Sequence, residues 1–198
     1  ESYGMTETGM NTSNPLDGER IAGTVGQPLP GVSLRIVDAG GGLCGRGTVG
    51  SIEVRGPNVF AGYWKLPEKT KEEFTADGWF RTGDQGLWTP EGYVAIVGRA
   101  KDMIISGGLN VYPKEIEERI DAMPGVVESA VVGVPDPDFG EVGVAAVCAK
   151  PGHALTEKFI IAELKREIAA FKVPKRVFFV AELPRNSMGK VQKAALRE

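Results

Sequence analysis

The side-chain periodicity of the chain changes close to Gly98, and this change restricts the possible folds more than any other feature. Between residues 25 and 97, short alternating runs such as 33–37 and 51–54 are separated by turns that contain Gly. Alternation with a period of two, interrupted by turn residues, is typical of short strands with tight reversals. Residues 67–74 interrupt the pattern with a Pro followed by acidic residues, which predicts a short helix.

After Gly98 the spacing becomes helical. Residues 113–123 carry Ile116 and Ile120 on one face after a Pro, and a second apolar stripe recurs over residues 156–171. Three runs rich in β-branched residues predict strands, at 125–134, 142–149 and 177–180. Two or three helices with three strands define a compact α+β unit. We therefore predict an α+β protein of two parts, a β-rich subdomain (1–98) and a small α+β domain (99–198).

The charge balance excludes several classes of partner. The chain has 198 residues, with 23 Lys and Arg against 26 Asp and Glu, and it contains no long basic run. It therefore lacks the electrostatic footprint of a protein that binds nucleic acid or an anionic membrane. No apolar run approaches the roughly 20 residues needed to span a bilayer, and the first residues do not form a signal peptide. We predict a cytoplasmic protein.

The cysteines and the first residues of the chain lead to two further predictions, on the state of the thiols and on the length of the parent protein. Cys44 and Cys148 are far apart, and His153 is the one histidine. This spacing indicates neither a zinc site nor a disulfide framework, so we predict two reduced thiols. The chain has no initiator Met and opens directly on a motif, which predicts an excised piece of a longer protein.

Two segments of the first part combine residue types that could bind a nucleotide. In Tyr3-Gly4-Met5-Thr6-Glu7-Thr8, a hydroxyl beside a carboxylate could hold a phosphate and its Mg²⁺, because hard cations take oxygen ligands. A plain polar turn uses the same residue types. In residues 81–84, Asp84 follows a Gly in an expected loop, where its carboxylate could accept both hydroxyls of a ribose or stabilise a turn.

Three more segments lie at or beyond the junction. Residues 98–102 are charged and form the natural linker, either functional or simply solvated. Two glycines after Ser106, Gly107 and Gly108, let the backbone approach a ligand closely or turn with positive φ. Lys190 lies in a Gly-containing loop, where it could reach an anion or remain solvated like most loop lysines.

Taken together, these segments resemble the adenylate-forming superfamily of acyl-coenzyme A synthetases, luciferases and peptide-synthetase adenylation domains. The likeness covers essentially the whole chain and is carried by YGMTET, GYW, GWFRTGD, GRAKDMIISGGLNVYP, EIE and PRNSMGK. Members of this superfamily make an acyl-adenylate from ATP and a carboxylate, and then pass the acyl group to a thiol. The resemblance implies an acid–thiol ligase that uses ATP, Mg²⁺ and coenzyme A.

The resemblance also implies roles for residues of the first part. Tyr3 is expected against adenine, Thr6 at a phosphate and Glu7 on Mg²⁺. Asp84 and Arg99 are expected at the ribose hydroxyls. Residues 1–98 would form the C-terminal end of the large nucleotide- and acyl-binding domain, as part of a distorted barrel.

In the second part, the resemblance implies a mobile lid. Lys101 is expected to be the hinge, and Lys190 to bridge the carboxylate and the α-phosphate during adenylation. A point charge between two anions offsets their repulsion and stabilises the charge that develops in transfer. After rotation, the Ser106-Gly107-Gly108 segment would admit the pantetheine arm of coenzyme A. Loss of the Lys190 charge by acetylation would abolish the bridge, so a lysine acetyltransferase and a deacetylase are expected partners.

Within the superfamily, the closest resemblance is to malonyl-coenzyme A synthetases. It rests on residues 5–8 and 10–15, on Gly18-Glu19-Arg20 and on residues 110–117. A buried second carboxylate of malonate or methylmalonate needs a cation, because an unpaired buried charge is costly. Arg20 is the candidate cation, although a surface Arg in a Gly-containing loop would look the same.

Other functions remain open from the sequence. The parent protein could activate a fatty acid or another acid, or it could be an adenylation domain that loads a carrier protein. The chain itself could be a non-catalytic binding module. The superfamily's phosphate loop and most of its acyl pocket precede the motif with which this chain begins, so we expect the isolated 198-residue chain to be inactive.

Overall fold

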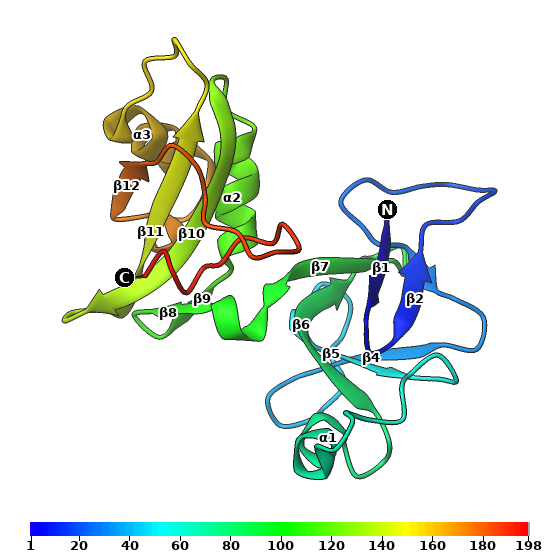
Figure 1. Cartoon of the computed structure of the whole chain (residues 1–198). Helices are drawn as coiled ribbons and strands as arrows, with labels where there is room; N and C mark the ends of the chain where they lie inside the picture. Colours follow the sequence, from blue (N-terminus) through cyan, green and yellow to red (C-terminus); the bar gives the residue numbers. More distant parts are fainter. Residues whose placement is uncertain (198) are drawn as a thin grey trace. The chain divides into compact units, whose positions relative to one another are not determined.

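The computed structural model describes residues 1–197, which form two compact units that divide after Ala100 (Figure 1). The expected division lay after residue 98. The difference arises because Arg99 ends the last strand of the first unit, β7 (Val94–Arg99), where it pairs with Asp84 of the neighbouring strand. A 3-10 turn, η1 (Ala100–Asp102), follows directly.

The first unit contains two antiparallel sheets. The smaller has the order β1-β2-β3, and its strands are β1 (Ser2–Met5), β2 (Gly9–Ser13) and β3 (Gln27–Pro28). The larger has the order β4-β5-β6-β7, and its other strands are β4 (Ser33–Val37), β5 (Gly50–Arg55) and β6 (Phe80–Trp88). Helix α1 (Pro67–Glu73) lies between β5 and β6 in the sequence. The β-rich character predicted for this part is confirmed.

The core of the first unit lies on one face of the larger sheet. Alternate residues such as Ile52 and Val54 are fully buried there, and Tyr3 from the smaller sheet packs into the same cluster. Two backbone hydrogen bonds of 2.8 Å, from Val25 to Val94 and from Val94 to Gly26, join β7 of the larger sheet to the segment directly before β3. The strands among residues 1–197 do not close into a barrel, so the distorted barrel expected from the resemblance is present only as two open sheets.

The second unit is a five-stranded sheet with two helices (Figure 1). Its elements after η1 are β8 (Ile104–Ser106), β9 (Leu109–Val111), α2 (Pro113–Asp121), β10 (Val126–Asp136), β11 (Gly140–Ala149), α3 (Glu157–Glu167), the 3-10 turn η2 (Ala170–Lys172) and β12 (Arg176–Phe179). The sheet order is β10-β11-β8-β9, and β12 pairs in parallel with β11. The sequence predicted three strands, because β8 and β9 have only three residues each and carry little periodicity.

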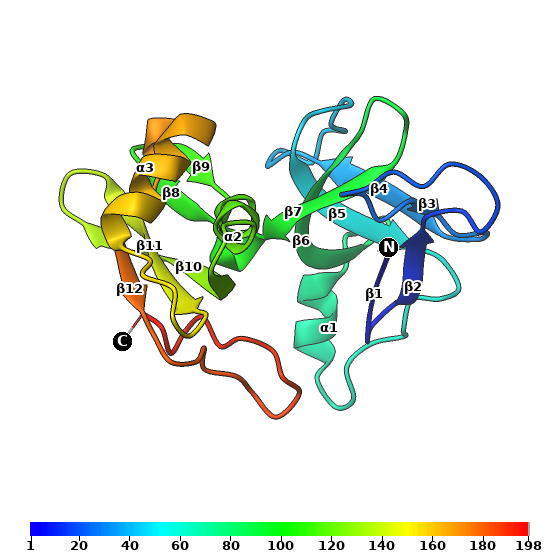
Figure 2. The same cartoon turned by 90° about the horizontal axis from the view of Figure 1, so that it is seen from above.

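Alternation along β10 and β11 lets the sheet of the second unit bury both faces. On one face, Val131 and Val147 pack against α2 and α3, which lie on the same side of the sheet (Figure 2). On the other face, Ala130 and Cys148 contact Leu183 and the C-terminal segment. The segment that carries Lys190 therefore belongs to the face away from the two helices.

The helices agree with the predicted ranges, with one difference. Helix α3 ends at Glu167 instead of near residue 171, because Ile168 is extended (φ −127°, ψ 159°) and η2 forms a separate turn. Thr156 caps the start of α3 by accepting the N–H of Phe159. No helix within residues 1–197 has the length and apolar character to cross a bilayer.

Candidate nucleotide and acyl-transfer site

A buried carboxylate joins the two sheets of the first unit. Asp84 is 6% exposed, and Tyr3 donates a 2.6 Å hydrogen bond to its Oδ2. Arg99, the cross-strand partner of Asp84, places Nε 3.1 Å from its Oδ1. One oxygen of this carboxylate thus accepts a hydrogen bond, and the other forms an ion pair. The structure brings together three residues that the resemblance assigns to the nucleotide.

Asp84 lies inside strand β6, so its expected position in a loop was wrong. The segment 80–86 alternates strictly, with Thr82, Asp84 and Gly86 buried between exposed or half-buried neighbours. Because the buried residues Thr82 and Asp84 are polar, this period of two is not visible as an alternation of hydrophobic residues. Burial of Asp84 is tolerated because its charge is paired and hydrogen-bonded.

Tyr3 and Thr82 hold the side chain and the backbone of Asp84 in place. Burial, followed by the negative charge of Asp84, raises the pKa of the Tyr3 phenol well above its usual value of 10. Tyr3 therefore stays a neutral donor at every physiological pH. Thr82 accepts the N–H of Asp84 at 3.1 Å and donates to the carbonyl of Ile52 at 2.8 Å, which ties the backbone at Asp84 to β5.

The turn between β1 and β2 carries the other two predicted nucleotide residues. Thr6 is exposed and Glu7 is half-buried. The backbone of Glu7 accepts the N–H of Phe60 at 2.8 Å, and its Oε1 accepts the hydroxyl of Tyr63 at 3.1 Å. Tyr63 was not among the predicted site residues, although it lies in the GYW segment, where its aromatic hydroxyl was the available signal.

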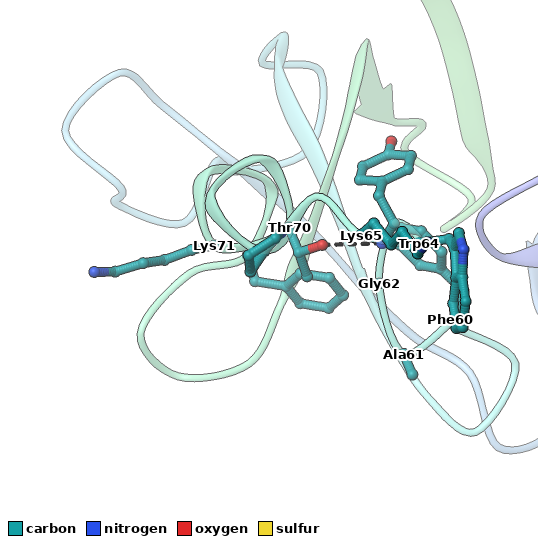
Figure 3. A pocket seen from close by; sticks show the side chains of 10 residues that line it. Phe60, Ala61, Gly62, Trp64, Lys65, Thr70 and Lys71 are labelled. Carbon is teal, nitrogen blue, oxygen red and sulfur yellow. Dashed lines mark hydrogen bonds between the residues drawn. The ribbon is translucent and has the colours of Figure 1, made fainter.

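The loop that contacts Glu7 also lines an open groove of about 740 Å³ beside α1 (Figure 3). Thr70 of α1 accepts the backbone N–H of Tyr63 at 2.9 Å, the contact drawn dashed in Figure 3. Phe60 stacks on Phe74 and meets Phe80 edge-on. These contacts fix the loop, and through it the Glu7 carboxylate.

The residues around Glu7 fit a magnesium ion that is held mainly by a ligand. Within residues 1–197, no three His, Cys, Asp or Glu side chains gather to form a metal cage. Mg²⁺ is commonly bound through one or two carboxylates together with substrate phosphates. A single oriented carboxylate, with Thr6 as its neighbour in the sequence, matches that pattern.

In the second unit, Lys190 lies in an ordered turn and is exposed. Arg185 and Val191 form an antiparallel bridge at the base of the turn. The side chain of Asn186 accepts the N–H groups of Met188 (3.0 Å) and Lys190 (2.9 Å). The backbone at Lys190 is therefore fixed, while its ammonium group lies on the surface.

The Ser106-Gly107-Gly108 segment forms the tight turn of the β8–β9 hairpin. Gly107 and Gly108 both have positive φ, 58° and 80°, and residues with a Cβ rarely adopt such backbone angles. Ser106 is buried, and Gly107 donates its N–H to the carbonyl of Phe139 at 2.8 Å. The surface at Gly108 is open, because a Cβ built there meets nothing within 4 Å.

The last two candidates, Lys101 and Arg20, occupy a junction and a surface loop. Lys101 is exposed, lies in η1 and is the first residue of the second unit. Arg20 is exposed and donates to the carbonyls of Pro15 (3.1 Å) and Leu16 (2.9 Å), which closes its own loop. These contacts match the alternative that the sequence left open for Arg20, a surface Arg.

Comparison with known proteins identifies the family. Residues 1–64 match the family model described as AMP-binding enzyme, and residues 115–190 match the model of the AMP-binding enzyme C-terminal domain. The chain therefore belongs to the AMP-binding enzyme family.

One solved structure and two individual relatives are similar to the chain over nearly its whole length. The crystal structure of ATP-bound MatB from Rhodopseudomonas palustris matches 99% of the chain with a TM-score of 0.94 and 59% identity. A 3-[(3aS,4S,7aS)-7a-methyl-1,5-dioxo-octahydro-1H-inden-4-yl]propanoyl:CoA ligase of Rhodococcus jostii is 47% identical over 100% of the chain. A mitochondrial malonate–CoA ligase of Mus musculus is 40% identical over 99% of it. The chain spans 37% to 39% of the length of these three proteins.

Proposed function

We propose that the full-length protein carrying this chain is an AMP-forming acyl-coenzyme A synthetase. The observation that carries the proposal is the Asp84 carboxylate, held between Tyr3 and Arg99 in the unit that also carries the turn of Thr6 and Glu7. Two of the relatives named above are CoA ligases, which supports the reaction class. The first unit would then end the large domain, and the second would be its mobile lid.

The proposed nucleotide site uses the hydrogen bond and the ion pair of Asp84. A carboxylate has about four lone-pair positions, so positions remain for ribose hydroxyls beside the contacts with Tyr3 and Arg99. The Tyr3 ring would lie against adenine and the Thr6 hydroxyl would meet a phosphate. Glu7 would hold Mg²⁺, whose charge would offset that of the phosphates.

Lys190 is proposed as the catalytic residue of the first half-reaction. Its ammonium group would lie between the substrate carboxylate and the α-phosphate, and stabilise the charge that develops as the acyl-adenylate forms. In the second half-reaction the lid would turn at Lys101 and bring the β8–β9 hairpin to the acyl-adenylate. The open surface at Gly108 would then admit the pantetheine arm of coenzyme A.

Replacement of Lys190 tests this assignment. In the full-length protein, Lys190→Ala should reduce acyl-adenylate formation, followed by ATP–pyrophosphate exchange, by at least about a hundredfold. The same variant should consume a supplied acyl-adenylate with coenzyme A at close to the wild-type rate. Unchanged exchange would remove Lys190 from the mechanism. The same proposal makes Lys190 the site at which a lysine acetyltransferase would switch the enzyme off.

For the substrate, we favour malonate or methylmalonate, with Arg20 at the second carboxylate. The malonate–CoA ligase among the relatives supports this choice, whereas the Rhodococcus jostii relative acts on a much larger acid. Arg20→Met should abolish use of the two dicarboxylates and spare that of butyrate. An unchanged preference for malonate over butyrate would exclude Arg20 from the acyl pocket.

A further inference from the structure

The segment that follows Lys190 is attached to the second unit by a sheltered ion pair. Lys193 Nζ lies 2.6 Å from Glu117 Oε1, and the two side chains are 19% and 18% exposed. Every other ion pair described in this unit is more exposed. Solvent and salt weaken exposed pairs most, so this pair is the least screened of the ion pairs described in the unit.

Glu117 is itself fixed to the sheet. The same Oε1 accepts the backbone N–H of Val131 at 2.7 Å, and Val131 lies in β10, the first strand of the sheet order β10-β11-β8-β9. An N–H of such an end strand needs an acceptor from outside the sheet, and α2 supplies it. One carboxylate oxygen therefore joins α2, the end strand and the segment after Lys190.

The two limbs of the Lys190 turn are held to the same strand. Before the turn, Arg185 forms an ion pair with Glu128, which lies in β10. After the turn, Lys193 reaches Glu117, which is bound to β10 through Val131. Val191 and Leu196 also pack against the apolar cluster on that face of the sheet. The turn is thus anchored on both sides.

We propose that Glu117 is a positioning residue for Lys190, acting through Lys193. A lysine that bridges two anions must be held to a fraction of an ångström, because small misplacements of a catalytic group lower the rate strongly. The internal hydrogen bonds of the turn fix its shape, and the pair of Glu117 with Lys193 fixes its place on the unit. The inference rests on the proposed role of Lys190.

Amide hydrogen exchange on the full-length protein tests the anchoring without any activity. Glu117→Gln keeps an oxygen for the Val131 N–H and removes the charge that holds Lys193. In this variant and in Lys193→Met, the amides of Lys190 and Gln192 should exchange about five to ten times faster than in the wild type. Lys193→Arg keeps the positive charge, so its amides at Lys190 and Gln192 should stay as protected as in the wild type.

A matched control uses the neighbouring ion pair of the same helix. Lys172 Nζ lies 2.8 Å from Glu115, and neither residue contacts the segment 184–193 in the described interactions. Lys172→Met should leave exchange at Lys190 unchanged. Equal protection of Lys190 in the wild type, Glu117→Gln and Lys193→Met would overturn the anchoring.

The two half-reactions of the full-length protein test the positioning. Glu117→Gln should lower the kcat of ATP–pyrophosphate exchange about tenfold, with little change in KM for ATP, and leave thiolysis of a supplied acyl-adenylate within about twofold. An equal fall in both half-reactions would show a merely structural role and overturn the inference. A wild-type protein that forms no acyl-adenylate would refute the proposed function instead, and the exchange data would still decide the anchoring.

Discussion

At the scale of single residues, the site depends on contacts between positions that are distant in the sequence. Tyr3 and Asp84 are 81 positions apart, and Glu7 and Tyr63 are 56 apart. Each carboxylate is held by a phenol that remains neutral, because burial raises the pKa of both tyrosines, to about 12 for Tyr63. The neutral Tyr63 hydroxyl orients the Glu7 carboxylate without cancelling its charge, which leaves that charge available to a ligand, whereas the charge of Asp84 is paired with Arg99.

The hydroxyl of Tyr3 should contribute measurably to stability. Tyr3→Phe leaves Asp84 buried with one donor fewer, so the free energy of unfolding should fall by about 1 to 2 kcal/mol. Tyr93→Phe is the matched control, since that hydroxyl binds the exposed carbonyl of Glu19 and its loss should cost less than about 0.5 kcal/mol. Urea denaturation measures both values. A wild-type stability for Tyr3→Phe would contradict the role of this bond.

Asp77 should give a clear pH signature. A hydrogen bond from Thr75, followed by the bidentate contact with Arg35, lowers the pKa of Asp77 from 3.8 to about 2. The folded state favours the carboxylate, so its contribution to stability is complete above pH 3.8 and is lost as the pH falls through 2. A carboxyl NMR titration should show a midpoint near 2 that moves upward in Thr75→Val. A wild-type midpoint near 3.8 would refute these contacts.

At the scale of elements, the sequence predicted the helices and strands whose signals are local, such as a regular apolar spacing or a Pro at the first position. The strand 33–37 and the helices that begin at Pro67 and Pro113 are confirmed because their apolar spacing or their Pro at the start is local information. The three-residue strands β8 and β9 were missed, and β6 was interpreted as a loop at Asp84, because pairing with distant strands decides these conformations. Motifs identified the candidate residues, but the partners Tyr63 and Lys193 emerge only from the fold.

The β8–β9 hairpin should depend on its two glycines to different degrees. Gly108→Ala should destabilise the second unit by about 1 kcal/mol, because its φ of 80° is unfavourable for a residue with a Cβ. Gly107→Ala should cost more, since its Cβ would also lie 3.3 Å from the Phe139 ring. Gly108→Asn should be tolerated better, because Asn accepts positive φ. Denaturation curves rank the three variants, and equal losses for Gly107→Ala and Gly108→Ala would contradict the hairpin geometry.

At the scale of the whole molecule, each of the two units carries part of the proposed chemistry. The first unit holds the nucleotide candidates, and the second holds Lys190 and the β8–β9 hairpin. Lys190 and the hairpin are assigned to different half-reactions, so a turn at Lys101 would let one small domain serve both. The sequence indicated this division through the change of periodicity at Gly98.

Restricting the backbone at Lys101 tests whether the second unit must rotate between the two half-reactions. Lys101→Pro fixes φ near −65° and removes an N–H, so the lid should no longer turn freely. In the full-length protein, adenylation should stay within about threefold of the wild type while thioester formation falls by at least about a hundredfold. Lys101→Ala, which keeps the backbone free, should retain both half-reactions. Equal loss of both in Lys101→Pro would refute the hinge.

We propose that the full-length protein activates a small carboxylic acid with ATP and transfers the acyl group to coenzyme A. The most direct measurement is coenzyme A-dependent release of AMP, with malonate, methylmalonate, acetate and octanoate offered in parallel. We predict rapid release with the two dicarboxylates and little with the other two acids. Activity on acetate or octanoate would withdraw malonate and keep the reaction class, whereas no coenzyme A-dependent AMP from any acid would contradict the proposed function.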